Sequence, residues 1–355
     1  MAYTTINKSS EHFNTKLYTG TDSAQTVTGV GFQPDFTWIK CRNYGGSGSF
    51  NHVLNDVIRG VGDVLVTNST SASNSSYDYG SLASFNNDGF TTVAGGTSID
   101  GVGGGARTYA SWNWKANGTG VSNTDGTITS TVSANTTSGF SIVKYTGTGA
   151  NATFGHGLGA VPKMYILKRY DSSNNWRVYH ESIGNGKYMT LETTEAEQTS
   201  SGFTNNTSPT SSLISLGNLG SANPSGGSVI CYAFAEKQGY SKFGSYTGNG
   251  STDGTFVYTG FKPAFVIAKG SSFGSAWTMS DNKRDSDNVI NGQLFSNNNN
   301  AEDTSASNSM CDYLSNGFKM RSTGGAMNSS GNTYIYMAFA EAPLVGTNGV
   351  TAKAR

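Results

Sequence analysis

The four histidines are the first candidates for chemistry, and their positions argue against a shared site. His12, His52, His156 and His180 lie in different segments, and none has a cysteine or a second histidine at the spacing of metal ligands. Residues 270–274, GSSFG, fit the G-x-S-x-G pattern of hydrolases, in which the triad histidine follows the serine. Because the last histidine is His180, we expect this segment to be a flexible loop.

Two glycine-rich segments, 101–106 and 147–152, fit the dinucleotide-binding pattern. That pattern works by placing a pyrophosphate at the N-terminus of a helix within a β-α-β unit, and neither segment has such a setting. In a chain with 47 glycines among 355 residues, such matches arise by chance. We therefore predict that the protein binds no cofactor.

The acidic clusters also favour structural roles. Residues 281–287, DNKRDSD, resemble a calcium loop weakly, because the glycine and glutamate of that loop are absent. We expect Arg284 to pair with the neighbouring Asp281, Asp285 and Asp287. A second acidic group could be imagined as a glycosidase pair, but a solvated polar loop is the simpler interpretation of Glu192, Glu195 and Glu197. We predict no catalytic residue and no metal site.

A stretch that occurs three times organises the chain around these residues. It reads YTGTDSAQTVTGVGFQPDFTWIK at 18–40, YTGTGANATFGHGLGAVPKMYILK at 145–168 and YTGNGSTDGTFVYTGFKPAFVIAK at 246–269. Such self-similarity indicates one structural unit used three times. We interpret each copy as the core hairpin of its unit. Binding is then expected in the loops that differ between copies, just past each final lysine, at 43–51, 171–175 and 270–275.

The segments around the three copies also correspond. The closing segments VICYAFAEK and YIYMAFAEAP share Ala-Phe-Ala-Glu, so Glu236 and Glu341 recur at one place, where the first copy has Lys115. Recurrence predicts a structural charge at a strand end. Residues 85–90, FNNDGF, and 314–320, LSNGFKM, predict hairpins with type I′ turns. Residues 199–203, TSSGF, occupy the matching position in the second copy.

Composition narrows the class of protein. Formal net charge is zero and only 13% of residues are charged, so the basic excess of a nucleic-acid-binding protein is missing. There is no apolar run of about 18 residues to insert into a membrane, and the N-terminus lacks the layout of a signal peptide. A glycine-rich chain that also has 18 Tyr and 18 Phe is typical of all-β folds with many turns. The three cysteines are expected to be buried free thiols.

The predicted fold is all-β, with three related β-sandwich-like (jelly-roll-like) units in tandem. Its expected parts are an N-terminal docking arm at 1–16, units at 17–118, 139–238 and 239–343, a linker at 119–138 and a polar tail at 344–355.

Several motifs resemble a known family. GFQPDFTWIK, SWNWKANG, SKFGSYTGNGSTDGTFVYTGFKP, DNKR, LSNGFKM and YIYMAFAEAP are similar to segments of repeated β-domain virion structural proteins of marine tailed bacteriophages, usually labelled as tail-fibre or uncharacterised structural proteins. The resemblance covers nearly the entire chain. It implies a component of the virus particle, without implying which surface of the particle. We expect the protein to be made in the host cytoplasm and to lie on the virion surface.

The resulting expectation is a non-enzymatic structural protein, most simply a tail fibre or tail-tip protein for host adhesion. The alternative within this class is a capsid decoration or head-fibre protein. A polysaccharide-degrading spike enzyme and a free-standing lectin are alternatives from other classes. Expected partners are other virion proteins, further copies of the chain in a homo-oligomer, with a trimer as the first guess, and a host surface glycan.

Overall fold

The computed structural model describes residues 3–43, 50–305, 310–346, 349 and 351, and this part of the chain is almost entirely antiparallel β-sheet. Its helices are short: α1 (Ser201–Thr204) and the 3-10 turns η1 (Ser9–Glu11) and η2 (Glu181–Ile183). The all-β prediction is therefore confirmed. None of the described helices is long and apolar enough to cross a membrane. Cys41, Cys231 and Cys311 are buried free thiols, as predicted.

The N-terminal sheet has the strand order β1-β8-β3-β4-β5. Its strands are β1 (Phe13–Thr19), β8 (Thr108–Trp114), β3 (Phe36–Cys41), β4 (Val53–Asp56) and β5 (Gly60–Val66). A smaller outer sheet covers one face of it, in the order β2 (Gln25–Thr28), β7 (Gly89–Val93) and β6 (Ser81–Asn86). The two sheets enclose an apolar cluster that includes Val27, Ile39 and Phe90.

The C-terminal sheet repeats this order as β19-β26-β21-β22-β23. Its strands are β19 (Ser241–Thr247), β26 (Thr333–Pro343), β21 (Phe261–Gly270), β22 (Thr278–Asp281) and β23 (Leu294–Phe295). Its outer sheet consists of β20 (Phe256–Tyr258), β25 (Gly317–Met320) and β24 (Cys311–Leu314).

The middle sheet contains the same five-strand pattern, β11-β18-β13-β14-β15, extended at both edges to eight strands. The strands, in sheet order, are β16 (Gln198–Thr199), β15 (Lys187–Thr190), β14 (Trp176–His180), β13 (Pro162–Arg169), β18 (Ser228–Ala235), β11 (Phe140–Thr146), β10 (Ser130–Asn135) and β9 (Val121–Asn123). Its outer layer is the pair β12 (Ala152–Gly155) and β17 (Leu213–Leu216). The predicted division into three units stays a prediction, but the repeated strand order is a feature of the structure.

Two predictions about the middle segment are wrong. The expected linker, 119–138, contributes β9 and β10 to the middle sheet, where Val132 pairs with Val143. Its β-branched residues, such as Thr131 and Val132, suit a strand, which explains why it adds to the sheet edge. The segment 199–203, expected to match a hairpin, instead enters α1, and Phe203 fills the outer core beside Tyr165.

The thrice-repeated stretch is not a hairpin, which corrects the interpretation given above. In every sheet the closing strand (β8, β18 or β26) lies between the first and last strands of the repeated stretch. The middle of each stretch (β2, β12 or β20) crosses to the outer layer. When the chain returns to the large sheet, it skips one strand position and takes the position after it. The vacant position is then filled by a strand from much later in the chain.

The two predicted short hairpins do form, but not with the predicted turns. Asn86 pairs with Gly89, and Leu314 pairs with Gly317. A type I′ turn needs positive φ at both central residues, and neither Asn87, Asp88, Ser315 nor Asn316 has it. The Asp88 carboxylate instead accepts hydrogen bonds from the backbone N–H groups of Gly29 and Gly31, at 2.9 and 2.6 Å.

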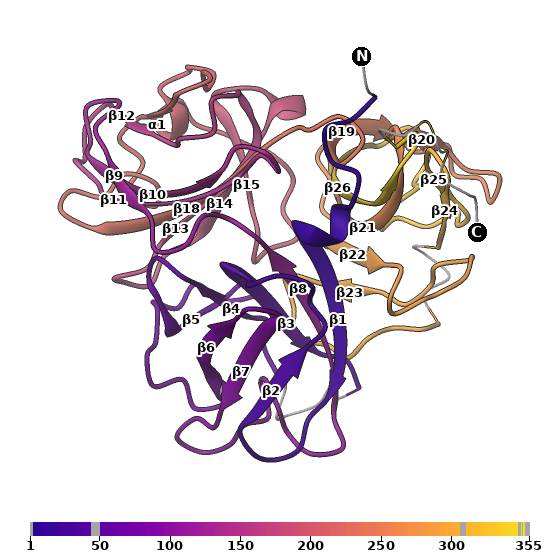
Figure 1. The fold of residues 1–355 in the computed structure, drawn as a ribbon. Helices are drawn as coiled ribbons and strands as arrows, with labels where there is room; N and C mark the ends of the chain where they lie inside the picture. Colours follow the sequence, from indigo (N-terminus) through magenta and orange to yellow (C-terminus); the bar gives the residue numbers. More distant parts are fainter. Residues whose placement is uncertain (1–2, 44–49, 306–309, 347–348, 350, 352–355) are drawn as a thin grey trace.

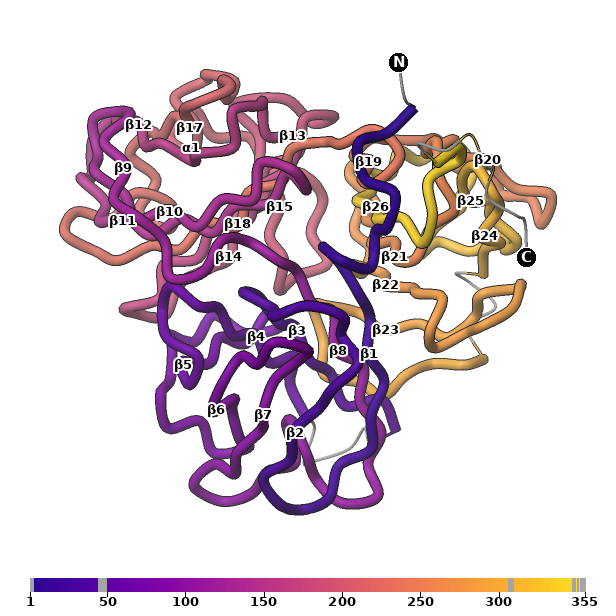
Figure 2. Tube along the Cα trace, in the orientation of Figure 1, coloured from indigo at the N-terminus to yellow at the C-terminus, as the bar shows by residue number. Residues whose placement is uncertain are grey.

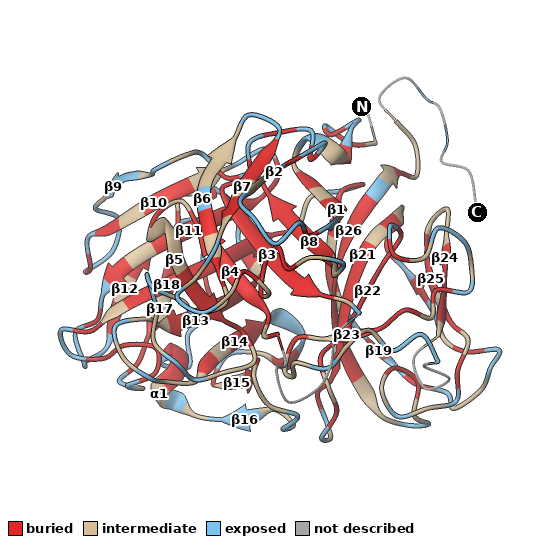
Figure 3. Ribbon diagram, turned by 90° about the horizontal axis from the view of Figure 1, so that it is seen from below, coloured by how far each residue is buried: buried red, intermediate tan, exposed pale blue. Residues whose placement is uncertain are grey.

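The three large sheets share one apolar core. Figure 1 shows them as three lobes, and Figure 3 shows that most of their strand length is buried. Aromatic rings meet across the lobes: Phe36 and Tyr232 lie 4.6 Å apart, Phe13 and Phe339 5.0 Å, and Trp114 contacts rings from all three sheets. Each fully buried large side chain contributes about 1.5–3 kcal/mol, so the shared core joins the lobes strongly.

The predicted docking arm packs onto the protein itself. Ile6 is buried in the shared core, the Tyr3 hydroxyl donates to the Gly260 carbonyl at 2.7 Å, and the Thr4 hydroxyl donates to that of Gln238 at 2.7 Å. Figure 2 shows this segment running alongside the C-terminal lobe. Its apolar side chain explains the difference, because an exposed Ile6 would lose the free energy of burial. In the predicted tail, Leu344 donates to Gly260 at 3.3 Å.

Candidate functional site

The segments that fit catalytic or cofactor patterns are tied into the fold. Ser271 donates to the carbonyl of Thr333 at 3.3 Å, and Ser272 accepts from the N–H of the same residue at 3.1 Å. In the segment 101–106, Gly105 donates to the Asp22 carboxylate at 2.5 Å. In the segment 147–152, Thr148 donates its backbone N–H to the Asn223 side chain at 2.7 Å. These bonds give the segments structural roles.

The histidines occupy four separate environments. His52 and His180 are fully buried, His156 lies beside the Thr210 carbonyl, and His12 is half-buried near Asn135. Among the described residues no group of three or more His, Cys, Asp or Glu side chains could hold a metal ion. Burial lowers the pKa of His180 to about 4, so this ring is neutral at pH 7.

The Glu192 group is less solvated than expected. Glu192 accepts hydrogen bonds from the Asn175 side chain at 2.7 Å and the Trp176 N–H at 3.1 Å, and burial raises its pKa. Glu197 pairs with Lys187 at 2.5 Å, while Glu195 is exposed. The three carboxylates therefore serve different contacts.

The lysine that closes each repeated stretch is completely buried. Lys40 donates to the carbonyl of Cys41, Lys168 to those of Thr70 and Asn174, and Lys269 to those of Gly270 and Thr194. Burial lowers the pKa of each amine to about 8. Two of these bonds join different lobes, because Thr70 belongs to the N-terminal lobe and Thr194 to the middle lobe.

A tryptophan beside each of these two lysines makes the same crossing. The Trp176 indole donates to the carbonyls of Val66 and Ser69 in the N-terminal lobe, both at 3.1 Å. The Trp277 indole donates to the Thr190 carbonyl in the middle lobe at 3.0 Å. A further contact joins the N-terminal and C-terminal lobes: the Thr67 hydroxyl donates to the Ser296 carbonyl at 3.1 Å. Each lobe therefore contacts both of the others. We call these lines of contact the seams.

Buried ion pairs lie on two of the seams. Asp56 pairs with Arg59, and Asp281 with Arg284, each at 2.6 Å with fully buried side chains. Asp56 also accepts from the Tyr232 hydroxyl at 2.7 Å. The Arg284 interpretation is thus confirmed for Asp281, whereas Asp285 accepts from the N–H groups of Asn291 and Gly292.

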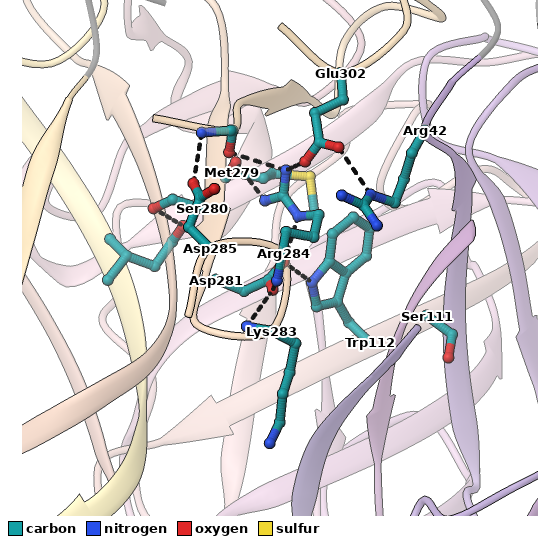
Figure 4. Close-up of polar contacts among 12 residues, drawn as sticks. Arg42, Ser111, Trp112, Met279, Ser280, Asp281, Lys283, Arg284, Asp285 and Glu302 are labelled. Carbon is teal, nitrogen blue, oxygen red and sulfur yellow. Dashed lines mark hydrogen bonds and ion pairs between the residues drawn. The ribbon is translucent and has the colours of Figure 1, made fainter. Parts of the chain in front are cut away.

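Figure 4 shows the second of these pairs in its surroundings. Asp281 accepts from the Trp112 indole of the N-terminal lobe at 3.0 Å, and Arg284 reaches Glu302 at 2.7 Å. Glu302 in turn pairs with Arg42 of the N-terminal lobe at 2.8 Å. The linked ion pairs Asp281–Arg284–Glu302–Arg42 therefore run from the C-terminal lobe to the N-terminal lobe.

The middle lobe has a histidine instead of an aspartate–arginine pair at the equivalent position. His180 occupies the place of the aspartate, since it pairs with Met164 as Asp281 pairs with Phe265. Ile183 follows three residues later, where the other lobes have arginine. The His180 ring lies 3.1 Å from the Tyr336 carbonyl of the C-terminal lobe. Met337 of the C-terminal lobe occupies the place of Trp112 and Tyr232, and its side chain has no N–H or O–H to donate. The neutral His180 ring therefore replaces the ion pair at this position.

The loops expected to bind a ligand take part in the seams. Asn174 donates its backbone N–H to Thr70 at 2.7 Å, and Ser275 donates to Thr194 at 2.8 Å. In the first loop, residues 44–49 lie outside the described residues, and Arg42 beside it pairs with Glu302. The loops 171–175 and 270–275 therefore hold adjacent lobes together, and the expectation that they bind a ligand stays a prediction.

The outer sheet of the C-terminal lobe has a surface of another kind. Phe256 and Tyr258 on β20 are 43% and 53% exposed, and they are the only aromatic side chains classed as exposed among the described residues. Val257 between them is buried, so both rings lie on the outward face of the strand. The Phe256 ring lies over Gly317 of β25, where an added Cβ would come within 3.1 Å of it.

A hollow of about 310 Å3 adjoins Tyr258. Tyr3, Glu236, Gln238, Lys242 and Thr259 line it together with neighbouring backbone. Burial raises the pKa of Tyr3 to about 12, and its hydrogen bond with Tyr258 adds to this. We call Phe256, Tyr258 and this hollow the aromatic face, and it is the candidate site.

The charged groups around the aromatic face are compensated by one another. Lys242 pairs with Glu236 at 2.7 Å. On the neighbouring strands, Lys319 pairs with Asp253 and Arg321 with Asp312, both at 2.5 Å. Glu236, predicted to be a strand-end structural charge, therefore has that role and also borders the site.

Sequence reasoning missed these aromatic residues, although a signal was present. At the matching positions the N-terminal lobe has Thr26 and Thr28 and the middle lobe has Thr153 and Gly155, each flanking one buried residue. Only the third copy has rings at both outward positions of this strand. A comparison of the copies position by position would have found the difference.

Comparisons with known proteins add one match. A family model described as "Domain of unknown function (DUF7483)" matches residues 8–343. No curated protein and no solved structure matches the chain.

Proposed function

The chain belongs to the DUF7483 family, and we propose that it is a structural protein exposed on the surface of a tailed bacteriophage virion. Its role would be that of a tail fibre or tail-tip protein for host adhesion, without enzymatic activity. The virion assignment is supported by the sequence resemblance described above. Within the fold, the resembling segments GFQPDFTWIK, SWNWKANG and YIYMAFAEAP overlap β3, β8 and β26, which line the shared core.

The observation that carries adhesion is the aromatic face, where Phe256 and Tyr258 are 43% and 53% exposed. Phe256 and Tyr258 leave apolar ring area in water, which costs free energy in the isolated protein unless a partner covers it. The buried charged residues, in contrast, have their partners within the chain, as in the pairs Asp56–Arg59 and Asp281–Arg284. A role in binding another surface therefore accounts for the exposed rings of Phe256 and Tyr258.

A capsid decoration or head-fibre protein is the second candidate. It is favoured by the seams, because three lobes joined through a shared core and buried polar contacts suit a part that must stay folded outside the cell. Both candidates imply contact with other virion proteins, and further copies of this chain are expected partners in a homo-oligomer.

Localisation on the intact particle tests the proposal. We expect gold-labelled antibodies against the purified protein to decorate tails or tail tips in electron micrographs of virions. Labelling confined to heads would support the second candidate. Purified particles that contain none of the chain by mass spectrometry would overturn the virion assignment altogether.

A further inference from the structure

We propose that the aromatic face of the C-terminal lobe binds a neutral polysaccharide, with Phe256 and Tyr258 stacking against sugar rings. This inference rests on the proposed adhesive function and names its ligand class and its site. The ligand is inferred from three properties of the face: the spacing of its rings, the balance of its charges and the polar groups of its hollow.

The rings first provide a suitable stacking surface. Phe256 and Tyr258 are two residues apart on β20 and point the same way, so their side chains are separated by about 7 Å along the strand. The C–H face of a pyranose ring is apolar and carries slight positive charge, which the negative face of an aromatic ring attracts. Two rings on one strand would bind successive sugar units of an extended chain.

The supports beneath the rings hold them in place. The Phe256 ring lies on Gly317, a position where any Cβ would also collide with the Val257 carbonyl. The Tyr258 hydroxyl is held beside that of Tyr3, which in turn donates to Gly260 at 2.7 Å. Rings that are fixed before binding lose less conformational entropy when a ligand arrives.

The charges beside the face select for a neutral ligand. Three pairs of charged side chains lie beside the face: Lys242 with Glu236, Lys319 with Asp253 and Arg321 with Asp312. An ionic ligand would have to break one of these pairs. A neutral sugar can instead exchange hydrogen bonds with their outer atoms and with Gln238 and Thr259 in the hollow.

Two other hollows among the described residues do not offer this combination. One is lined by His12, Phe32 and Lys115, and another by Phe13, Asn14 and Lys283. In both, the aromatic side chain is buried, with Phe32 4% and Phe13 2% exposed. The ring surface needed for stacking is therefore present at the aromatic face.

Affinity electrophoresis of the purified full chain tests the proposal. The gels would contain dextran, galactan or mannan as neutral probes, alginate as an acidic probe, or no polysaccharide. We expect at least one neutral polysaccharide to retard the protein. Tyr258→Ala and Phe256→Ala should each raise the dissociation constant about tenfold or more, which corresponds to about 1.4 kcal/mol. Tyr258→Phe, which keeps the ring, should retain most of the retardation.

The matched control is Thr26→Ala/Thr28→Ala at the equivalent positions of the N-terminal lobe, which should leave retardation unchanged. Thermal unfolding of each variant shows whether it is folded. The proposal is overturned if none of the three neutral polysaccharides retards the protein, or if the alanine variants are retarded like the unmodified chain. It is also overturned if light scattering shows a dimer that Tyr258→Ala dissociates, because a second copy would then cover the face. Failure here leaves the particle-labelling result intact, so the two proposals can fail separately.

Discussion

At the scale of single residues, the molecule places polar groups in its interior and satisfies them across lobe boundaries. Asp56 and Asp281 each receive an arginine from their own turn and an N–H or O–H donor from another lobe. His180 receives neither, and the Tyr336 carbonyl is its neighbour. Buried donors and acceptors therefore complement each other at each seam. Replacing one partner alone should lower the free energy of unfolding more than replacing both partners.

The Asp281 seam allows a direct comparison. Asp281→Ala should lower the free energy of unfolding by about 3 kcal/mol or more, because it leaves Arg284 buried with less compensation. The double variant Asp281→Ala/Arg284→Met should lose less, since the middle lobe already functions without an ion pair here. Urea denaturation of both variants measures the difference. A double variant less stable than the single one would contradict this account.

His180 predicts a pH dependence of stability. Burial lowers its pKa to about 4 from an ordinary value of 6.5, so between these values the unfolded chain binds a proton that the folded chain does not. Stability should therefore fall as pH decreases from 6.5 to 4, by about 3 kcal/mol from this residue. Urea midpoints at pH 7 and 4.5 should differ less in His180→Gln than in the unmodified protein. Equal pH dependence in both proteins would rule out this role.

At the scale of elements, the loops 171–175 and 270–275 are seam contacts. The Ser275 hydroxyl accepts the backbone N–H of Gly270 at 2.9 Å, and Ser275 donates its own backbone N–H to the Thr194 carbonyl at 2.8 Å. Glu197 donates its backbone N–H to the Ser271 carbonyl at 2.9 Å. The loop therefore joins the C-terminal lobe to the middle lobe by backbone hydrogen bonds, and the Ser275 side chain bonds within its own lobe.

Replacing 271–275 with a Gly-Ser sequence of equal length should accordingly destabilise the fold by about 1–2 kcal/mol. Binding of polysaccharide should stay unchanged, because the aromatic face is on other strands. Thermal unfolding and affinity electrophoresis of the same sample measure the two properties. Unchanged stability with lost binding would favour the original interpretation of this loop as the binding surface.

At the scale of the whole molecule, the shared core makes the lobes interdependent. Trp114 contacts Phe13, Phe140, Phe265 and Phe339, which come from all three large sheets. A lobe alone would expose the inner face of its sheet to water. Domains joined by large apolar interfaces unfold together rather than in sequence.

Scanning calorimetry should therefore show one unfolding transition whose calorimetric and van't Hoff enthalpies agree. Residues 239–343 expressed alone should not give the dispersed amide spectrum of a folded domain. Three resolved transitions, or a folded isolated lobe, would show that the lobes are independent units.

Much of the frame was predictable from the sequence, because it depends on local pattern. Alternating side chains and turn residues predicted the all-β class and the hairpins at 85–90 and 314–320, and the absence of paired spacing predicted buried free cysteines. The three copies of one stretch indicated a repeated design, and the structure has the same strand order three times.

Only the tertiary structure decided how these parts combine. The insertion of β8, β18 and β26 between the ends of each repeated stretch depends on residues about 60 or more positions away, which no local pattern encodes. The same is true of the seams, where Lys168, Trp176 and Asp281 find their partners in other lobes. The exposure of Phe256 and Tyr258 was decided in this way too, because an outward ring and a buried ring look alike in a strand until the opposing layer is placed.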